Sequence, residues 1–350
     1  MSRLTQRHAY LRRRPAIPYP RPPPLLLPRK VALVLLLLAR ARAFTQPLFP
    51  WLPARALSSF SAASLPASEL TDPPILPPRY RYRGTLAYDG TYFSGWQVQS
   101  AGSQKAPRHR TVQGELAAAI RASCADLGLP LPERFCVVGA GRTDTGVHAA
   151  GQAFHFDLPS PPPPGLSLPS VALRLPPDVR LLSLSPAAPD FHAILSSSSK
   201  TYAYRISLAP VPDPFGRCYR HHVYYPLDLG LLRRALSLFV GRRDFRAFAG
   251  QVAQKEAKTG KPVDTVREVY SAELVDEGSG CYRISFRLKG ALYKMVRNLV
   301  GAALGVAAGK VPLAELERLM EEAPGREGNR SKPAPAGGLT MECVQYRGEE

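Results

Sequence analysis

The chain has 350 residues, which is long enough for one large or two average domains with hydrophobic cores. Its hydrophobic content of 45% excludes a predominantly disordered protein, and its five scattered cysteines, with no C-x-x-C spacing, argue against a disulfide framework or a zinc site. The formal net charge of +19 predicts a polyanionic partner.

Residues 1–80 have the composition of a targeting leader followed by a spacer. Residues 1–68 contain 11 Lys and Arg and no Asp or Glu, whereas the remainder holds 35 basic and 27 acidic residues, a net charge of +8. The run "VALVLLLLA" (31–39) is too short to span a bilayer but suits the apolar part of a signal peptide. A basic, acid-free stretch follows it, as in the bipartite leaders of algae with secondary plastids. We therefore expect an organellar protein, in a plastid rather than a mitochondrion, with no membrane association in the mature form. A long single presequence or a disordered extension would be the alternatives.

The first half of the body mixes strands with one clear helix. The pattern predicts a strand from Tyr82 that ends in a turn at Asp89, a polar loop over 100–110, and a helix over 111–128 with apolar residues near the 3.6 period. Short strands are expected over 134–139 and 151–158, followed by a proline-rich surface loop.

The second half repeats this mixture. We expect strands over 199–208, 264–275 and 281–290, and helices over 228–241, 291–310 and 313–323. Because neighbouring strands are joined by short connections, the order predicts an α+β protein with mostly antiparallel sheets.

The segment "VVGAGRTDTGVHAAGQAFHF" (137–156) begins like a dinucleotide-binding turn. However, Asp144 stands where the third glycine should be, and a carboxylate there would repel a pyrophosphate. Only four residues separate Gly146 from Gly151, where a strand pattern resumes, so no crossover helix fits. The segment is instead a sharp, glycine-flanked turn that presents Arg142, Thr143 and Asp144.

These residues resemble those of a known family. "AGRTDTGVHAAGQ" is similar to the catalytic signature of the TruA-type tRNA pseudouridine synthases, and "YDGTYFSGWQ", "TVQGELAAAI", "DFHA", "SKTYAYRI", "DFRAFAG", "YKMVRNLVGAAL" and "APAGGLTMECVQY" resemble its other blocks. The similarity runs in the expected order from about residue 82 to 348. One departure is Thr145, where the family usually has alanine.

The resemblance implies a two-lobed pseudouridine synthase fold, in which helices flank a mixed, mostly antiparallel sheet and a cationic cleft lies between the lobes. We assign residues 1–80 to the leader and spacer, 81–198 to an N-terminal catalytic lobe with the Asp144 turn, and 199–350 to a C-terminal lobe that completes the cleft. The implied reaction isomerises uridine to pseudouridine in structured RNA without cofactor or metal. The expected substrate is tRNA, with its anticodon stem-loop as the first candidate, and a homodimer is possible within the family.

The resemblance also suggests the site residues. Asp144 matches the catalytic aspartate, Arg142 an arginine that takes the place of the displaced base, and Tyr202 a tyrosine that packs on the target base. Arg297 matches a basic residue that pairs with the aspartate, and a buried cation there would favour the ionised carboxylate. The alternative for each is an ordinary structural role: a polar turn, a surface arginine or a core tyrosine.

The strand over 281–290 adds candidates of its own. Apolar residues alternate with Arg283, Arg287 and Lys289, which would contact RNA phosphates or form a solvated face. Two other classes of function stay open at this point. One is a non-catalytic RNA-binding chaperone on the same scaffold, and the other is a metal-dependent RNA hydrolase.

Overall fold

The computed structural model describes residues 80–98, 110–129, 131–132, 134–162 and 164–348. The predicted leader, apart from Tyr80, and nearly all of the predicted loop over 100–110 lie outside the described residues. The first strand begins at Tyr80, two residues before the predicted start, and the described residues belong to one compact unit. The division into two lobes stays a prediction.

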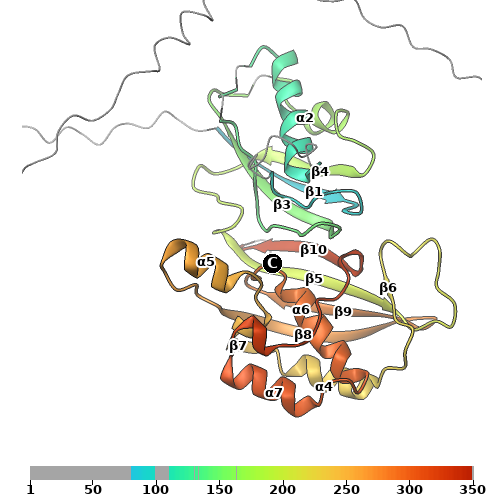
Figure 1. Ribbon diagram of the computed structural model, residues 1–350. Coiled ribbons are helices and arrows are strands. Elements are labelled where there is room, and N and C mark those ends of the chain that lie inside the picture. Colours follow the sequence, from blue (N-terminus) through green and yellow to red (C-terminus); the bar gives the residue numbers. More distant parts are fainter. Residues whose placement is uncertain (1–79, 99–109, 130, 133, 163, 349–350) are drawn as a thin grey trace, which may run out of the picture. The chain divides into compact units, whose positions relative to one another are not determined.

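One ten-stranded sheet runs through this unit (Figure 1). Its strands lie in the order β4-β1-β3-β10-β5-β9-β8-β7, with β2 added beside β3 and β6 beside β5. All pairs are antiparallel except β10 with β3 and β5 with β6, so the predicted mixed, mostly antiparallel sheet is confirmed. The strands are β1 Tyr80–Tyr88, β2 Val138–Gly139, β3 His148–Leu158, β4 Val179–Pro186, β5 Ser197–Ser207, β6 His221–His222, β7 Gly241–Asp244, β8 Val266–Gly278, β9 Cys281–Leu288 and β10 Leu339–Tyr346.

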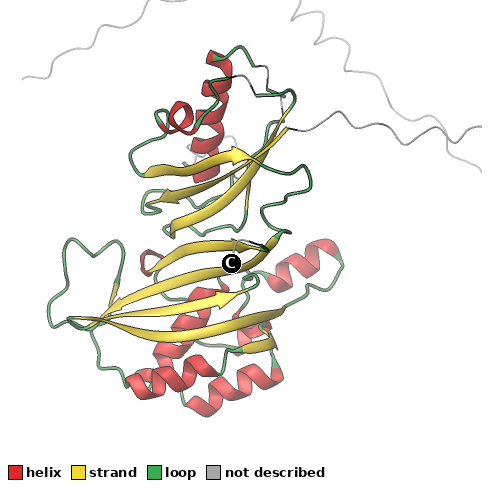
Figure 2. Ribbon diagram, turned by 180° about the vertical axis from the view of Figure 1, so that it is seen from behind, coloured by secondary structure: helices red, strands yellow, loops and turns green. Residues whose placement is uncertain are grey.

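Helices cover the sheet in two groups, which Figure 2 shows in red. The first group packs near β4 and the second, in which α4 contacts both α6 and α7, packs near β8. The α-helices are α2 Val112–Asp126, α3 Leu168–Ala172, α4 Leu229–Ser237, α5 Val252–Thr259, α6 Met295–Ala307 and α7 Leu313–Glu322, with short 3₁₀ turns at η2 Arg246–Phe248, η3 Arg326–Gly328 and η4 Ala336–Gly338. The predicted α+β class is therefore confirmed.

Helix α2 forms for reasons visible in the sequence. The Thr111 hydroxyl caps it by accepting a hydrogen bond from the Gly114 N–H at 3.3 Å. Its apolar stripe, with Leu116 and Ile120 fully buried, faces the core beneath β1 and β3. The chain then leaves the helix at Gly128, whose φ is +70°.

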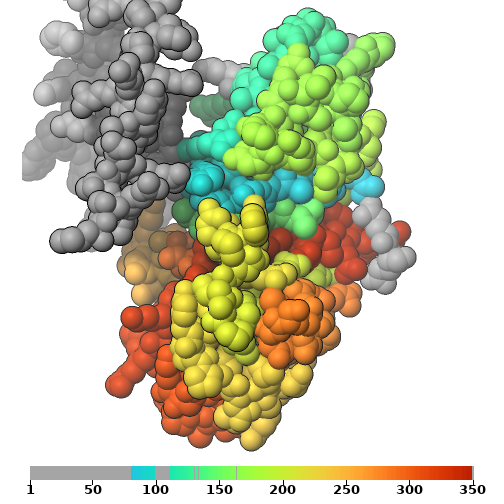
Figure 3. Space-filling view, turned by 90° about the vertical axis from the view of Figure 1, so that its right-hand side faces the viewer, coloured from blue at the N-terminus to red at the C-terminus, as the bar shows by residue number. Residues whose placement is uncertain are grey.

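The segment between β5 and β6 joins the two halves of the sheet. The Tyr219 hydroxyl donates to the Asp89 carboxylate at 2.7 Å, and the Tyr219 ring lies 5.0 Å from the His148 imidazole. His148 accepts from the Gly90 N–H at 3.0 Å through Nδ1 and bonds the Cys218 carbonyl through Nε2 at 3.0 Å. This segment, yellow in Figure 3, thus reaches the turn after β1, shown in blue. These contacts hold the two halves of the sheet together.

Candidate active site

Asp144 sits in the turn between β2 and β3. The Val147 N–H donates to the Asp144 carbonyl at 3.1 Å, which closes a four-residue turn. Gly146 occupies its third position with φ of +78°, a conformation that a residue with a side chain would adopt only under strain. On the other side of Asp144, the Thr143 hydroxyl bonds the buried Tyr88 hydroxyl at 2.8 Å. Burial raises the pKa of Tyr88 to about 12, so it stays a neutral hydrogen-bonding group. The turn is therefore fixed at both ends.

The Asp144 carboxylate forms an ion pair with Arg297. Nη1 of Arg297 lies 3.1 Å from Oδ2 of Asp144, and the two side chains are only 15% and 17% exposed. Arg297 is the third residue of α6, and its Nε donates to the Ala334 carbonyl at 2.8 Å. A second bond returns from the Ala334 N–H to the Arg297 carbonyl at 2.9 Å. The guanidinium is thus held in place by the backbone while it neutralises the carboxylate.

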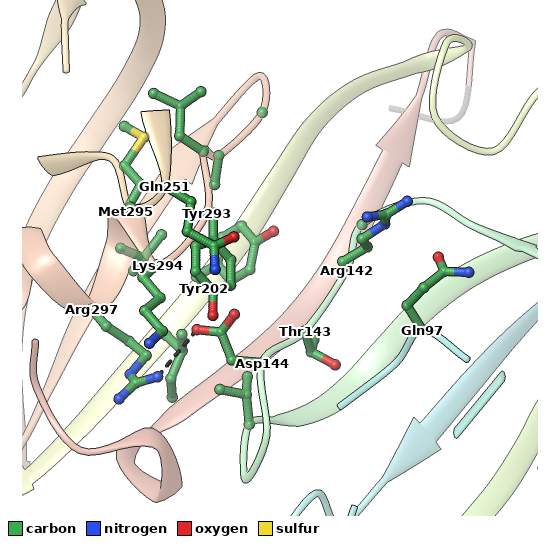
Figure 4. A pocket seen from close by; sticks show the side chains of 18 of the residues that line it. Gln97, Arg142, Thr143, Asp144, Tyr202, Gln251, Tyr293, Lys294, Met295 and Arg297 are labelled. Carbon is green, nitrogen blue, oxygen red and sulfur yellow. Dashed lines mark hydrogen bonds and ion pairs between the residues drawn. The ribbon is translucent and has the colours of Figure 1, made fainter. Parts of the chain in front are cut away.

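A cavity of about 1480 Å³ opens in front of this pair (Figure 4). Its wall combines the Asp144 turn, β5, the start of α5 and the loop 290–294 that leads into α6. Residues from segments that are distant in the sequence therefore form the wall of one cavity. Cavities of this size accommodate a drug-sized or nucleotide-sized ligand.

The cavity wall is strongly cationic. Asp144 is the sole carboxylate among the described residues that line it, and seven Lys or Arg side chains surround it: Arg142, Lys200, Lys255, Lys258, Arg267, Lys294 and Arg297. Clustered cations of this kind attract and orient phosphate groups. The cationic cleft that the resemblance implied is present.

Several known proteins are similar to this chain in sequence. The sequence model of a family described as tRNA pseudouridine synthase matches residues 235–347. A tRNA pseudouridine synthase A of Latilactobacillus sakei is 38% identical over 268 residues, which cover 76% of this chain and 99% of that protein. Proteins of the same name from Leuconostoc mesenteroides and Streptococcus thermophilus are 37% and 35% identical with the same coverage.

The chain belongs to the tRNA pseudouridine synthase A family.

Like the other members of that family, the protein is an isomerase. The site residues expected from the resemblance can now be located in the structure. Tyr202, on β5, is buried in the cavity wall, and Figure 4 shows it beside the Asp144 carboxylate. Burial raises the pKa of its hydroxyl, so the ring presents a neutral aromatic surface. Arg142 also lines the cavity, on the side away from Arg297 and near Gln97. Arg142 is exposed and makes no hydrogen bond or ion pair with any residue that the structure describes.

The three cations predicted on the strand over 281–290 do not line this cavity. Arg283 pairs with Glu277 at 3.0 Å, and Nε of Arg287 donates to the Ser199 hydroxyl at 3.3 Å. Lys289 is exposed. All three are absent from the described wall of the cavity. That these three residues contact RNA phosphates stays a prediction, and the proposed site does not depend on it.

Sequence reasoning overlooked several residues that build or line the site: Gln152, Lys200, Gln251, Tyr293 and Lys294. Strand alternation could have found Lys200, because it shares a face with Tyr202 two residues on. Gln251 and Lys294 carry no such signal. They matter because both hold positive φ angles, 61° and 58°, at the starts of α5 and α6.

Proposed function

We propose that this protein isomerises uridine to pseudouridine in the anticodon stem-loop of tRNA, with Asp144 as the catalytic carboxylate. The observation that supports this most directly is the isolation of Asp144. It is the sole carboxylate of the described wall of a cationic cavity, and it is paired with Arg297 at 3.1 Å. Membership of the tRNA pseudouridine synthase A family supports the reaction and the RNA class.

The reaction breaks the bond between N1 of uracil and C1′ of ribose and forms a bond between C5 and C1′. The C5 hydrogen leaves as a proton and N1 gains one, so no atom is lost and no redox partner is required. Asp144 would attack C1′ or C6, or remove the C2′ proton. A base inside a stem is out of reach of any of these steps, so the nucleotide must leave its stack and enter the cavity.

The surrounding residues suit these steps. The guanidinium of Arg297 contacts the carboxylate and holds it in one orientation at the cavity wall. Tyr202 offers an aromatic surface on which a uracil ring can pack in more than one orientation as it turns. Arg142 is exposed at the cavity wall, where its planar guanidinium can stack in the place that the base vacates.

The test compares the full chain with its Asp144→Asn variant on tRNA that carries tritium at C5 of uridine. We expect the wild-type protein to release tritium, the variant to release none, and both to bind tRNA with affinities that agree within about twofold, since Asn differs from Asp by one atom and one charge. Asp190→Asn, on an exposed residue outside the described cavity wall, serves as the matched control and should keep full activity. Full tritium release by Asp144→Asn would refute the assignment.

The same assay separates the other two classes of function. An RNA-binding chaperone would release no tritium even as wild type, and a metal-dependent hydrolase would shorten the RNA and stop on addition of a chelator. Mapping pseudouridine in the reacted tRNA then tests the substrate position. Pseudouridine found only outside the anticodon stem-loop would refute the proposed substrate position but would still support the proposed reaction.

We further propose that the protein acts in an organelle, a plastid rather than a mitochondrion, because its first 68 residues are basic and acid-free. The full chain with a C-terminal fluorescent fusion should co-localise with plastid markers, and diffuse cytosolic fluorescence would refute this. A homodimer is proposed from the family, and light scattering of the purified protein tests it.

A further inference from the structure

Lys200 is the one cation of the described cavity wall that is buried. Its side chain is 6% exposed, whereas Arg142, Lys255 and Lys258 are exposed, and Arg297 is partly buried but paired with Asp144. The ammonium group of Lys200 makes no hydrogen bond or ion pair with any part of the chain that the structure describes.

The position of Lys200 follows from strand geometry. It lies on β5 two residues before Tyr202, so both side chains leave the same face of the strand and both line the cavity. Its neighbours across the sheet are Leu288 on β9 and Val344 on β10, both apolar. Cδ of Lys200 passes 3.9 Å from the point where a Cβ on Gly141 would lie, three residues before Asp144.

An ammonium group with little access to water and no partner is unfavourable. A charged group loses hydration on burial, and only an opposite charge or several hydrogen bonds can replace it. Burial accordingly lowers the pKa of Lys200. A ligand that carries a full negative charge into the cavity would remove this penalty, whereas the neutral carbonyl oxygens of a uracil ring would do so only in part.

We propose that Lys200 binds a backbone phosphate group of the RNA, next to the nucleotide that enters the cavity. This rests on the proposed function for the identity of the ligand. A nucleotide that turns out of its stack carries its own phosphodiester with it, and the exposed cations Arg142, Lys255 and Lys258 of the same wall can hold the neighbouring phosphates. Lys200 is then the innermost of these positive charges, and it positions the ribose above Asp144 by fixing the phosphate beside it.

The experiment measures tRNA binding by the full chain as a function of salt concentration. Lys200→Met keeps the length and apolar stem of the side chain and removes the charge, and Lys200→Arg keeps the charge. Lys310→Met is the matched control, because Lys310 follows the far end of α6 and so lies roughly 20 Å from the cavity at which that helix begins.

We expect Lys200→Met to bind tRNA roughly tenfold more weakly than wild type. We also expect the slope of log affinity against log salt to fall by about 0.7 to 0.9, as for the loss of one phosphate contact. Lys200→Arg should keep the wild-type slope, and Lys310→Met should keep both the slope and the affinity. Wild-type affinity and slope in Lys200→Met would overturn the proposal.

A second measurement uses only the wild-type protein, so the proposal stays testable if Lys200→Met does not fold. Anticodon stem-loop RNAs are prepared with a single neutral methylphosphonate at each linkage in turn. At one linkage, the methylphosphonate should lower the affinity of the protein for the RNA roughly tenfold. Uniform affinity across all linkages would overturn the proposal. Both measurements report binding and are independent of the tritium-release assay. A wild-type protein that binds RNA in this way but releases no tritium would refute the proposed function and would still support the Lys200 contact.

Discussion

The side-chain amide of Gln152 forms two hydrogen bonds with the backbone of Gly141. Its Nε2 donates to the Gly141 carbonyl at 2.6 Å, and its Oε1 accepts from the Gly141 N–H at 3.3 Å. Gln152 is fully buried on β3, so the strand that follows the Asp144 turn also holds Gly141, three residues before Asp144. This contact sets the direction in which the chain enters the turn.

Replacing Gln152 by Met should therefore make the Asp144 turn less rigid, although the residues of the turn itself are unchanged. Met fills a similar volume but leaves two backbone groups without partners, so the free energy of unfolding should fall by about 1–3 kcal/mol. The rate of tritium release should fall as well, because Asp144 loses its fixed position. Urea unfolding and the release assay measure the two effects. Gln345→Met, which removes one hydrogen bond to Ser199 on a neighbouring strand, should leave the rate unchanged. An unchanged rate in Gln152→Met would contradict the prediction.

The ion pair of Asp144 and Arg297 should show strong coupling in a double-mutant cycle. Arg297→Met leaves a mostly buried carboxylate without its cation, so we expect a loss of about 3 kcal/mol in the free energy of unfolding. In the Asp144→Asn background the same change should cost less than half as much, since no charge is then left unpaired.

Arg297→Lys refines this cycle. A lysine can approach Asp144 or the Ala334 carbonyl, but it lacks the planar fork that contacts both in the present structure. Its activity should fall well below wild type although its charge is kept. Strictly additive losses in the cycle, or full activity in Arg297→Lys, would show that the pair does not position the carboxylate.

Much of the fold could be predicted because local signals agree with tertiary packing. The helix over 111–128 has a threonine cap, a regular apolar stripe and a terminal glycine, and α2 occupies 112–126. In β9 the residues Ile284, Phe286 and Leu288 alternate with polar ones, and all three are buried as expected. The turn with Asp144 was recognisable since too few residues separate it from the next strand for a crossover helix.

Other elements escaped prediction for physical reasons. Strand β4 lies at one edge of the sheet and is half exposed, so it lacks a continuous apolar run, and α5 is a short polar helix stabilised by its surroundings. The predicted helix over 291–310 was too long, because residues 291–294 form a loop and Lys294 takes a left-handed conformation before α6 starts at Met295. Composition cannot reveal such a conformation, nor which of several cations a cavity will enclose. Alternation places Lys200 on the same strand face as Tyr202, but it does not show that this face lines a cavity, just as it did not show that Arg283, Arg287 and Lys289 lie outside the described cavity wall.

The loops before α5 and α6 depend on close contact between Gly250 and Tyr293. The Gly250 N–H donates to the Tyr293 carbonyl at 2.8 Å, and a Cβ on Gly250 would lie 2.8 Å from the Tyr293 ring. Gly250→Ala should force the two loops apart, with a loss of about 1–3 kcal/mol in the free energy of unfolding and slower tritium release. Gly290 lines the same cavity, and a Cβ there meets nothing within 4 Å. Gly290→Ala should therefore behave as wild type, and equal behaviour of the two variants would contradict the prediction.

His155 should make stability depend on pH independently of the cavity, whose described wall does not include it. The side chain is 4% exposed, and its Nδ1 accepts from the Ala193 N–H at 3.1 Å, a bond that protonation of Nδ1 would break. Burial, with a smaller contribution from the positive charge of Arg81, lowers the pKa of His155 to about 4 from 6.5.

The sign of the effect follows from these two pKa values of His155. Between pH 6.5 and 4 the unfolded chain binds a proton that the folded chain does not, so the stabilisation present above pH 6.5 is lost as the pH falls through this window. The expected slope is about 1.4 kcal/mol per pH unit, and the total loss approaches about 3 kcal/mol near pH 4. His155→Asn supplies an acceptor oxygen that does not titrate in this window. Urea unfolding of both proteins from pH 7 to pH 4 isolates the contribution as the difference between their slopes, since every other group is shared. Parallel curves for wild type and His155→Asn would mean that His155 gains no charge on unfolding.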